Sequence, residues 1–175
     1  MTYANFWQRF AAAWIDFFVL LPVMLIRAWL EPTSKTAAIV LIVPVTAAYC
    51  AYTIYCHGRF GKTIGKHAMR IRVVLKTGEK MGWRATWLRN SVDLPVAFLG
   101  IISSFIALFT IPDSKYYGFS WLQLESHLKD YHPVWHGWMI TFHGIWVWSE
   151  VVVMLFNKRR RAFHDFIAGT VVVAE

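Results

Sequence analysis

The chain has 175 residues, of which 57% are hydrophobic and 16% are charged, and its formal net charge is +8. This composition is too apolar for a water-soluble chain of this length and indicates an integral membrane protein with one domain. The positive charge does not indicate nucleic-acid binding, because the basic residues lie beside apolar runs, where they orient membrane proteins and contact lipid headgroups. The two cysteines, Cys50 and Cys56, lie in or beside one apolar run on different helix faces, which excludes a disulfide framework.

The first apolar run covers residues 6–30 and contains two opposite charges, Arg9 and Asp16. A membrane span needs about 20 mostly apolar residues, and this run reaches that length only if Asp16 lies inside the membrane. Arg9 and Asp16 are two helical turns apart, so both side chains project from nearly the same face. Because an acidic side chain that faces lipid costs at least about 2.5 kcal/mol, we expect this face to point towards other helices. Alternatively, Arg9 extends to the lipid headgroups.

Three further runs can cross a membrane, and we predict helices at residues 37–56, 88–111 and 134–156. The third run begins with Arg89 and Asp93, an i, i+4 pair on one helix face. We expect Pro95 to kink this helix just beyond the pair. The segment at 112–133, between the third and fourth runs, contains a candidate interfacial helix at 120–130.

The loop at 57–87 and the tail at 157–175 are basic. Between residues 57 and 89 there are nine Lys and Arg residues and one acid, Glu79. By the positive-inside rule the loop and the tail are cytoplasmic, so both termini lie inside and the segment 112–133 lies outside. Residues 70–75 alternate in part and are followed by a turn, which predicts a small β-hairpin on the membrane surface.

The β-branched residues at 169–173 predict a C-terminal strand that pairs with residues 70–75. The expected fold is therefore an all-α transmembrane four-helix bundle with both termini cytoplasmic, a small cytoplasmic β-hairpin and a C-terminal strand.

The chain contains four motifs in this order: Arg9 with Asp16, the GKTIGK turn at 61–66, Arg89 with Asn90, and RAFHDFIAGT at 161–170. In this order and spacing the sequence resembles the RDD family of small bacterial membrane proteins, over almost its whole length. The resemblance implies that Arg9, Asp16 and Asp165 are the family's arginine and two aspartates. Its other motif positions are Gly61, Lys62, Thr63, Gly65, Lys66, Asn90, His164, Gly169 and Thr170. It also implies a multi-pass protein of the bacterial inner membrane and suggests ion or solute transport, although the outer segment is longer and the fourth helix is rich in His and Trp.

Three carboxylates are expected in the inner half of the membrane. At about 1.5 Å per residue, Asp16, Glu150 and Asp93 lie about 15, 9 and 7 Å from the cytoplasmic ends of their helices. With Arg9 and Arg89 they can form one polar cluster or cavity open to the cytoplasm. The alternative is a static bundle in which Arg9, Asp16, Arg89 and Asp93 pair and hold the helices together.

On the fourth helix, His136, His143 and Glu150 recur every seven residues and form a stripe that suits a hydrated proton path. Alternatively, His136 and nearby His132 are interfacial and His143 bonds another helix. A metal site at His127, His132 and His136 rests on ligand spacing alone, and we expect no metal and no cofactor.

The GKTIGK turn is not a phosphate-binding loop, because Cys56 stands where the motif needs glycine. We expect a tight turn in which Lys62 and Lys66 meet lipid phosphates. Asp165 is expected to cap a short helix or to pair with an Arg or Lys of this turn.

Two functional hypotheses follow. The first is a small cation/proton exchanger that works through the cluster of Arg9, Asp16, Arg89, Asp93, His143 and Glu150. We expect such an exchanger to be a homo-oligomer, since four helices enclose little volume. The second is a non-catalytic membrane adaptor or assembly factor whose basic face binds anionic lipid or a partner protein. An intramembrane enzyme is the least favoured hypothesis, because no HExxH, GxSxG or Cys–His pattern occurs in adequate context.

Overall fold

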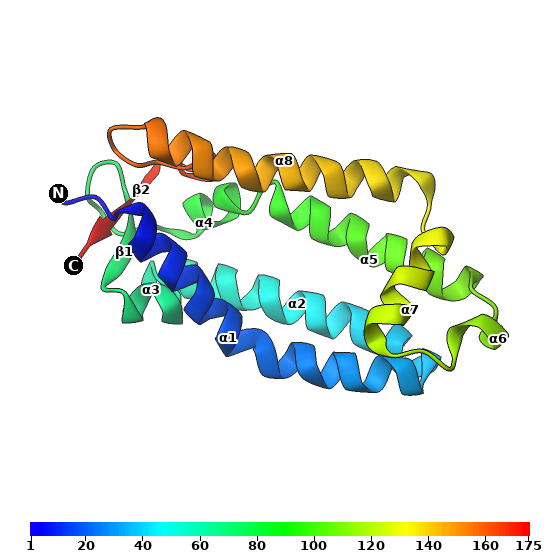
Figure 1. Cartoon of the computed structure of the whole chain (residues 1–175). Helices are drawn as coiled ribbons and strands as arrows, with labels where there is room; N and C mark the ends of the chain where they lie inside the picture. Colours follow the sequence, from blue (N-terminus) through cyan, green and yellow to red (C-terminus); the bar gives the residue numbers. More distant parts are fainter.

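The computed structural model describes residues 1–175 and consists of four long helices with a two-stranded sheet at one end (Figure 1). The long helices are α1 (Phe6–Leu30), α2 (Lys35–Phe60), α5 (Asp93–Thr110) and α8 (Val134–Phe156). All four are long and apolar enough to cross a membrane. The prediction of four membrane-spanning helices with a small sheet is therefore confirmed.

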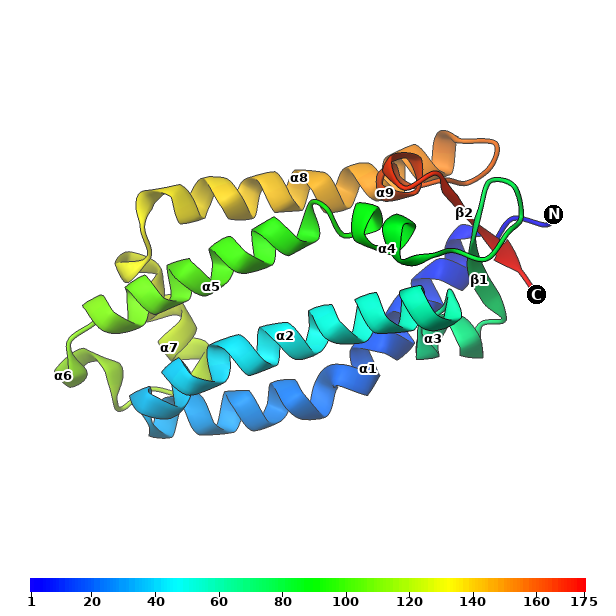
Figure 2. The ribbon, with the colours of Figure 1, turned by 180° about the vertical axis from the view of Figure 1, so that it is seen from behind.

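The remaining elements are short and lie at the two ends of the bundle. They are η1 (Glu31–Thr33), α3 (Ile64–Ala68), β1 (Ile71–Leu75), α4 (Trp83–Arg89), α6 (Asp113–Tyr116), α7 (Trp121–Leu128), η2 (Lys129–Tyr131), α9 (Phe163–Ile167) and β2 (Thr170–Ala174). Both chain termini, β1 and β2 lie at one end, here called the sheet end, and α6 and α7 lie at the opposite end, here called the α7 end (Figures 1 and 2).

Local sequence signals define where the first two long helices begin and end. Asn5 and Gln8 form a reciprocal capping box at the start of α1, with N···O distances of 2.8 and 2.9 Å. Ser34 caps α2 by accepting a hydrogen bond from Ala37 N at 3.2 Å. Gly61 ends α2 with φ of 72°, a left-handed conformation that favours glycine. As a result, α2 is longer at both ends than the expected range 37–56.

The expectation of one helix at 88–111 that is only kinked at Pro95 is wrong, because the helix is interrupted. The chain forms α4, which ends at Arg89, and α5, which begins at Asp93. Pro95 explains the break, because proline has no N–H to donate to residue 91 and its ring clashes with that carbonyl group in a continuous helix. Arg89 and Asp93 consequently belong to two helices and are not an i, i+4 pair.

The long helices pack in a row. α2 packs against α1 and α5, and α8 packs against α5. At the α7 end, Ala38 and Ile42 of α2 form a buried cluster with Leu108 of α5 and with Leu124 and Leu128 of α7. The helix expected at 120–130 therefore forms, and its apolar side closes the α7 end of the bundle.

The sheet pairs segments that lie far apart in the sequence. β1 and β2 are antiparallel, with a register from Ile71 opposite Ala174 to Leu75 opposite Thr170, which confirms the expected pairing. The expected hairpin is reduced to one bridge between Val74 and Lys80. Its second strand does not form, because Val73 N on that edge of β1 already donates to Gly61 O at 2.8 Å.

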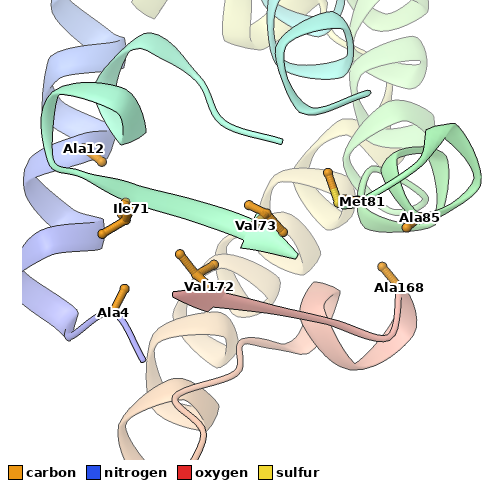
Figure 3. Close-up of a cluster of buried hydrophobic side chains, with 8 residues drawn as sticks. All are labelled: Ala4, Ala12, Ile71, Val73, Met81, Ala85, Ala168 and Val172. Carbon is orange, nitrogen blue, oxygen red and sulfur yellow. The ribbon is translucent and has the colours of Figure 1, made fainter. Parts of the chain in front are cut away.

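A compact apolar cluster joins the sheet to the helices around it. Ala4 and Ala12 from the N-terminal segment and α1 meet side chains of β1 and β2 (Figure 3). Met81, Ala85 and Ala168 complete the cluster from the segments around α4 and α9. The sheet end is thus packed against α1 and α4.

Candidate functional site

Asp165 lies at the centre of the sheet end and is fully buried, with a side-chain exposure of 0%. Its carboxylate accepts hydrogen bonds from Arg9 Nη1 at 2.9 Å, from Arg89 Nη1, and from Thr170 Oγ1 at 3.0 Å. It also accepts from Ala162 N at 3.1 Å and so caps α9. Although burial opposes ionisation, the positive charges of Arg89 and Arg9 hold the pKa of Asp165 well below its usual range.

Side-chain contacts through Arg89 and His164 connect Asp165 to Glu150 of α8. Arg89 Nη2 lies 2.5 Å from His164 Nε2, and His164 Nδ1 lies 2.5 Å from Glu150 Oε2. Because an arginine N–H can only donate, His164 Nε2 accepts from Arg89, and the His164 backbone N–H donates to Glu150 Oε1 at 2.9 Å. We call Arg9, Arg89, Glu150, His164 and Asp165 the Asp165 network. It connects α1, α4, α8 and α9, which are separate in the sequence.

Asp16 forms a different site. Its carboxylate accepts hydrogen bonds from Tyr52 Oη at 2.6 Å, Thr63 Oγ1 at 2.6 Å and Gly65 N at 2.7 Å. A Cβ atom on Gly65 would lie 2.0 Å from Ala12 O, so α3 can approach α1 only with glycine at this position. The GKTIGK turn therefore folds around the Asp16 carboxylate. This arrangement explains why the turn has a hydroxyl donor at Thr63 and a residue without a side chain at Gly65.

Of the two roles expected for Asp165, capping of a short helix is confirmed. Pairing with a basic residue of the GKTIGK turn does not occur, because the two arginines of α1 and α4 take that position. Lys62 Nζ instead lies 2.6 Å from Glu175 Oε2. Lys66 is partly buried, and burial, followed by the positive charge of Arg89, lowers the pKa of Lys66 to about 8.

Two other residues of the family motif, Asn90 and Gly169, lie directly after a short helix. Asn90 follows α4 and donates from Nδ2 to Thr86 O at 2.8 Å. Gly169 adopts φ of 67° between α9 and β2. Together with Gly61, these residues turn the chain so that it passes Asp16 and Asp165.

Asp93 and His143 form a third ionisable group, which joins α5 to α8. Their nearest N and O atoms are 3.6 Å apart, and the side chains are 44% and 39% exposed, respectively. Neither residue of the pair forms a hydrogen bond or an ion pair with Arg89 or Asp165, whose partners lie in the Asp165 network. The residues expected in one polar cluster are therefore distributed over three separate sites.

The histidines near the α7 end are bound to Ser103 of α5. His132 Nδ1 and His136 Nδ1 lie 2.7 and 2.8 Å from Ser103 Oγ, and their rings stack at 3.9 Å. Burial, followed by His136, lowers the pKa of His132. His127 packs on Phe119 with ring centroids 4.4 Å apart. The expected stripe on α8 therefore divides, with each of its members bound to a different partner.

Several site residues were missed at the sequence level. Tyr52 donates to Asp16 from inside an apolar run, and Arg161 donates to the backbone oxygens of Asp165 and Thr170 at 2.7 and 2.9 Å. A buried Glu31 near the α7 end accepts from Arg27 Nε at 2.6 Å and from Trp121 Nε1 at 3.0 Å. Two of these contacts have a local i, i+4 spacing, Arg27 with Glu31 and Arg161 with Asp165.

Comparison with protein families gives one match. The model of the RDD family matches residues 3–169. Neither the curated proteins nor the solved structures gave a match. The matched range includes Arg9, Asp16, Arg89 and Asp165, so it covers both the Asp165 network and the Asp16 site.

Proposed function

Since this chain belongs to the RDD family and has four helices able to cross a membrane, we propose that it is a membrane adaptor of the bacterial inner membrane. In this proposal, the charges of α1 and α4 have a structural role. They hold the sheet end rigidly against the bundle, and the basic surface of the sheet end binds anionic lipid headgroups. Both termini are cytoplasmic, as the positive-inside rule favours.

The observation that carries the proposal is the pairing of Asp165 with Arg9 and Arg89. A buried carboxylate held by two arginines and Thr170 has its lone pairs occupied, and such a group is poorly suited to exchange protons during transport. Asp16 is similarly occupied by three donors. These charges therefore serve better as connections between elements than as carriers of ions.

The sheet end carries a set of exposed basic side chains that is available for binding. We call this set the basic platform, and it consists of Arg59, Arg70, Lys76, Lys80, Arg84, Lys158, Arg159 and Arg160. A basic residue close to an anionic leaflet contributes about 1 kcal/mol to binding. Several such residues on one rigid surface suit recruitment of anionic lipids around the protein.

The test is lipid enrichment in proteoliposomes, measured by energy transfer from tryptophan to fluorescent phosphatidylglycerol or phosphatidylcholine. We expect preferential transfer to phosphatidylglycerol that falls as salt is raised from 0.1 to 1 M, where the Debye length shortens from about 10 to about 3 Å. The variant R59Q/K80Q/R84Q should lose much of the preference. Equal transfer to both lipids at low salt would refute the proposal.

Cation/proton exchange remains the second candidate function, because Asp93 and His143 form a half-exposed ionisable pair within apolar helices. Such a pair is costly to keep at membrane depth and is a candidate for function by default. The same vesicles, loaded with a pH-sensitive dye and given sodium, potassium or lithium, test this candidate. Flux that Asp93→Asn abolishes would favour transport over the adaptor.

A further inference from the structure

A pocket of about 390 Å³ lies at the sheet end between α1 and α8. Phe6 lines it from the first turn of α1, and Met154, Leu155 and Phe156 line it from the last turn of α8. Lys158 and Arg160 line it from the turn that follows α8. Its volume falls within the range of about 300–1,000 Å³ that is usual for small-molecule sites. None of its lining residues belongs to the Asp165 network or to the Asp16 site.

The pocket lies where two membrane spans end. Phe6 is the first residue of one candidate span and Phe156 is the last residue of another. The apolar part of the pocket thus faces the end of the hydrocarbon layer, while its basic part extends to the level of the headgroups. Phe156 is 88% exposed, so an apolar surface remains available beside the basic residues.

A tight turn places both basic residues at the pocket. Arg160 N donates to Asn157 O at 2.8 Å, and Arg159 N donates to Asn157 Oδ1 at 2.9 Å. Arg160 adopts φ of 49° in this turn. No acidic side chain lines the pocket, so Lys158 and Arg160 have no competing carboxylate there. This combination of two cations above an apolar wall complements a phosphate group attached to acyl chains.

We propose that this pocket binds one molecule of an anionic glycerophospholipid. Lys158 and Arg160 bind the phosphate, and Phe6 and Leu155 contact the glycerol and the first methylene groups of the chains. The chains then continue into the bilayer between α1 and α8, which pack on different partners: α1 on α2 and α3, and α8 on α5 and α9. The inference rests on the proposed placement of the sheet end at the cytoplasmic leaflet, and it adds a stoichiometric site to the diffuse enrichment by the basic platform.

Native mass spectrometry of the detergent-purified protein tests the site, with phosphatidylglycerol or phosphatidylethanolamine added as the probe. We expect one retained phosphatidylglycerol and at least tenfold weaker retention of phosphatidylethanolamine. The variant K158Q/R160Q should lose at least tenfold in phosphatidylglycerol affinity. The matched control K115Q/K129Q removes the same charge from exposed positions in α6 and η2, at the α7 end, and should bind as the wild type does.

A second variant, Leu155→Trp, changes no charge and fills the pocket from a side chain that is 59% exposed. It should also lose the retained lipid while its unfolding temperature stays within the experimental error. Equal retention of both lipids, or wild-type binding by K158Q/R160Q, would overturn the proposal.

Failure of this inference is distinguishable from failure of the proposed function. Salt-sensitive enrichment without a retained lipid would leave the adaptor proposal standing and remove the pocket site. A retained lipid that depends on Lys158 and Arg160, without salt-sensitive enrichment that depends on Arg59, Lys80 and Arg84, would keep the pocket site and refute the adaptor proposal.

Discussion

Asp165 and Asp93 are both carboxylates beside a basic partner, but their surroundings differ. The Asp165 side chain is 0% exposed and bonds to groups from α1, α4 and β2. The Asp93 side chain is 44% exposed and has one partner, His143, at 3.6 Å. A buried and fully bonded charge is costly to remove, because its partners are then left uncompensated, whereas an exposed pair contributes little to stability. Burial therefore separates a charge that we expect to stabilise the fold from one that we expect to contribute little to stability.

The largest expected effect comes from Asp165→Asn. This change leaves Arg9 and Arg89 buried without a counter-charge, and we expect a loss of about 3–5 kcal/mol in unfolding free energy. Detergent-solubilised protein should unfold at a much lower temperature or aggregate during size-exclusion chromatography. An unfolding temperature equal to that of the wild type would show that the network has no structural role.

The ionisation of Asp165 also determines how the stability of the protein changes at acidic pH. Because the folded pKa of Asp165 is held below its usual range, its contribution is fully present above the unfolded pKa of about 3.9 and is lost as pH falls towards the folded pKa. Thermal unfolding between pH 7 and 5 should therefore leave this contribution unchanged. In Asp165→Asn, the acid-dependent loss below about pH 4 should shrink.

The next largest effect is expected at the Asp16 site, from Gly65→Ala. The added Cβ meets Ala12 O at 2.0 Å and must push α3 away from α1, at a cost of about 1–3 kcal/mol. The matched control is Gly82→Ala, where nothing lies within 4 Å of the added atom. If the two variants unfold at the same temperature, the close approach of α3 to α1 does not contribute to stability.

Lys66 lies near Arg89, the buried arginine of the Asp165 network. The ionisation of Lys66 makes the stability of the protein depend on pH in the alkaline range. Its folded pKa of about 8 lies below the usual lysine value, so the folded state releases this proton more easily than the unfolded state. Stability should therefore rise with pH between about 8 and 10.4, the ordinary lysine pKa. Lys66→Met should stabilise the protein at pH 7 and flatten this part of the pH profile. A wild-type profile that falls over this range, or a destabilised Lys66→Met, would contradict the assignment.

The smallest expected effect on stability is that of Asp93→Asn, because the exposed pair with His143 contributes at most about 1 kcal/mol. Its unfolding temperature should lie close to that of the wild type. This makes Asp93→Asn the clean variant for the flux measurement, since a loss of flux could not then be ascribed to unfolding. A large destabilisation would instead place Asp93 with the structural charges.

The sequence predicted the elements better than it predicted their contacts. Four apolar runs and the pairing of β1 with β2 followed from hydropathy and β-branched residues, which are local properties. The helix at 88–111 was expected to kink at Pro95 and not to break, because proline near the start of a helix is tolerated. The local sequence did not show that the chain forms two helices there.

Only the tertiary structure decided which charges meet. Residues Arg9 and Asp165 are 156 positions apart, and Arg89 and Asp165 are 76 positions apart, so no periodicity relates them. From the sequence, each carboxylate near the inner end of a helix was an equal candidate for one shared cluster. The break after Arg89 and the return of the chain through β2 place Asp165 between two arginines, while Gly65 brings the GKTIGK turn to Asp16. Hydropathy thus determined which segments can cross the membrane, because burial in lipid acts on each segment separately. The packing of these segments against one another determined the partners of the charges, because an ion pair depends on three-dimensional distance.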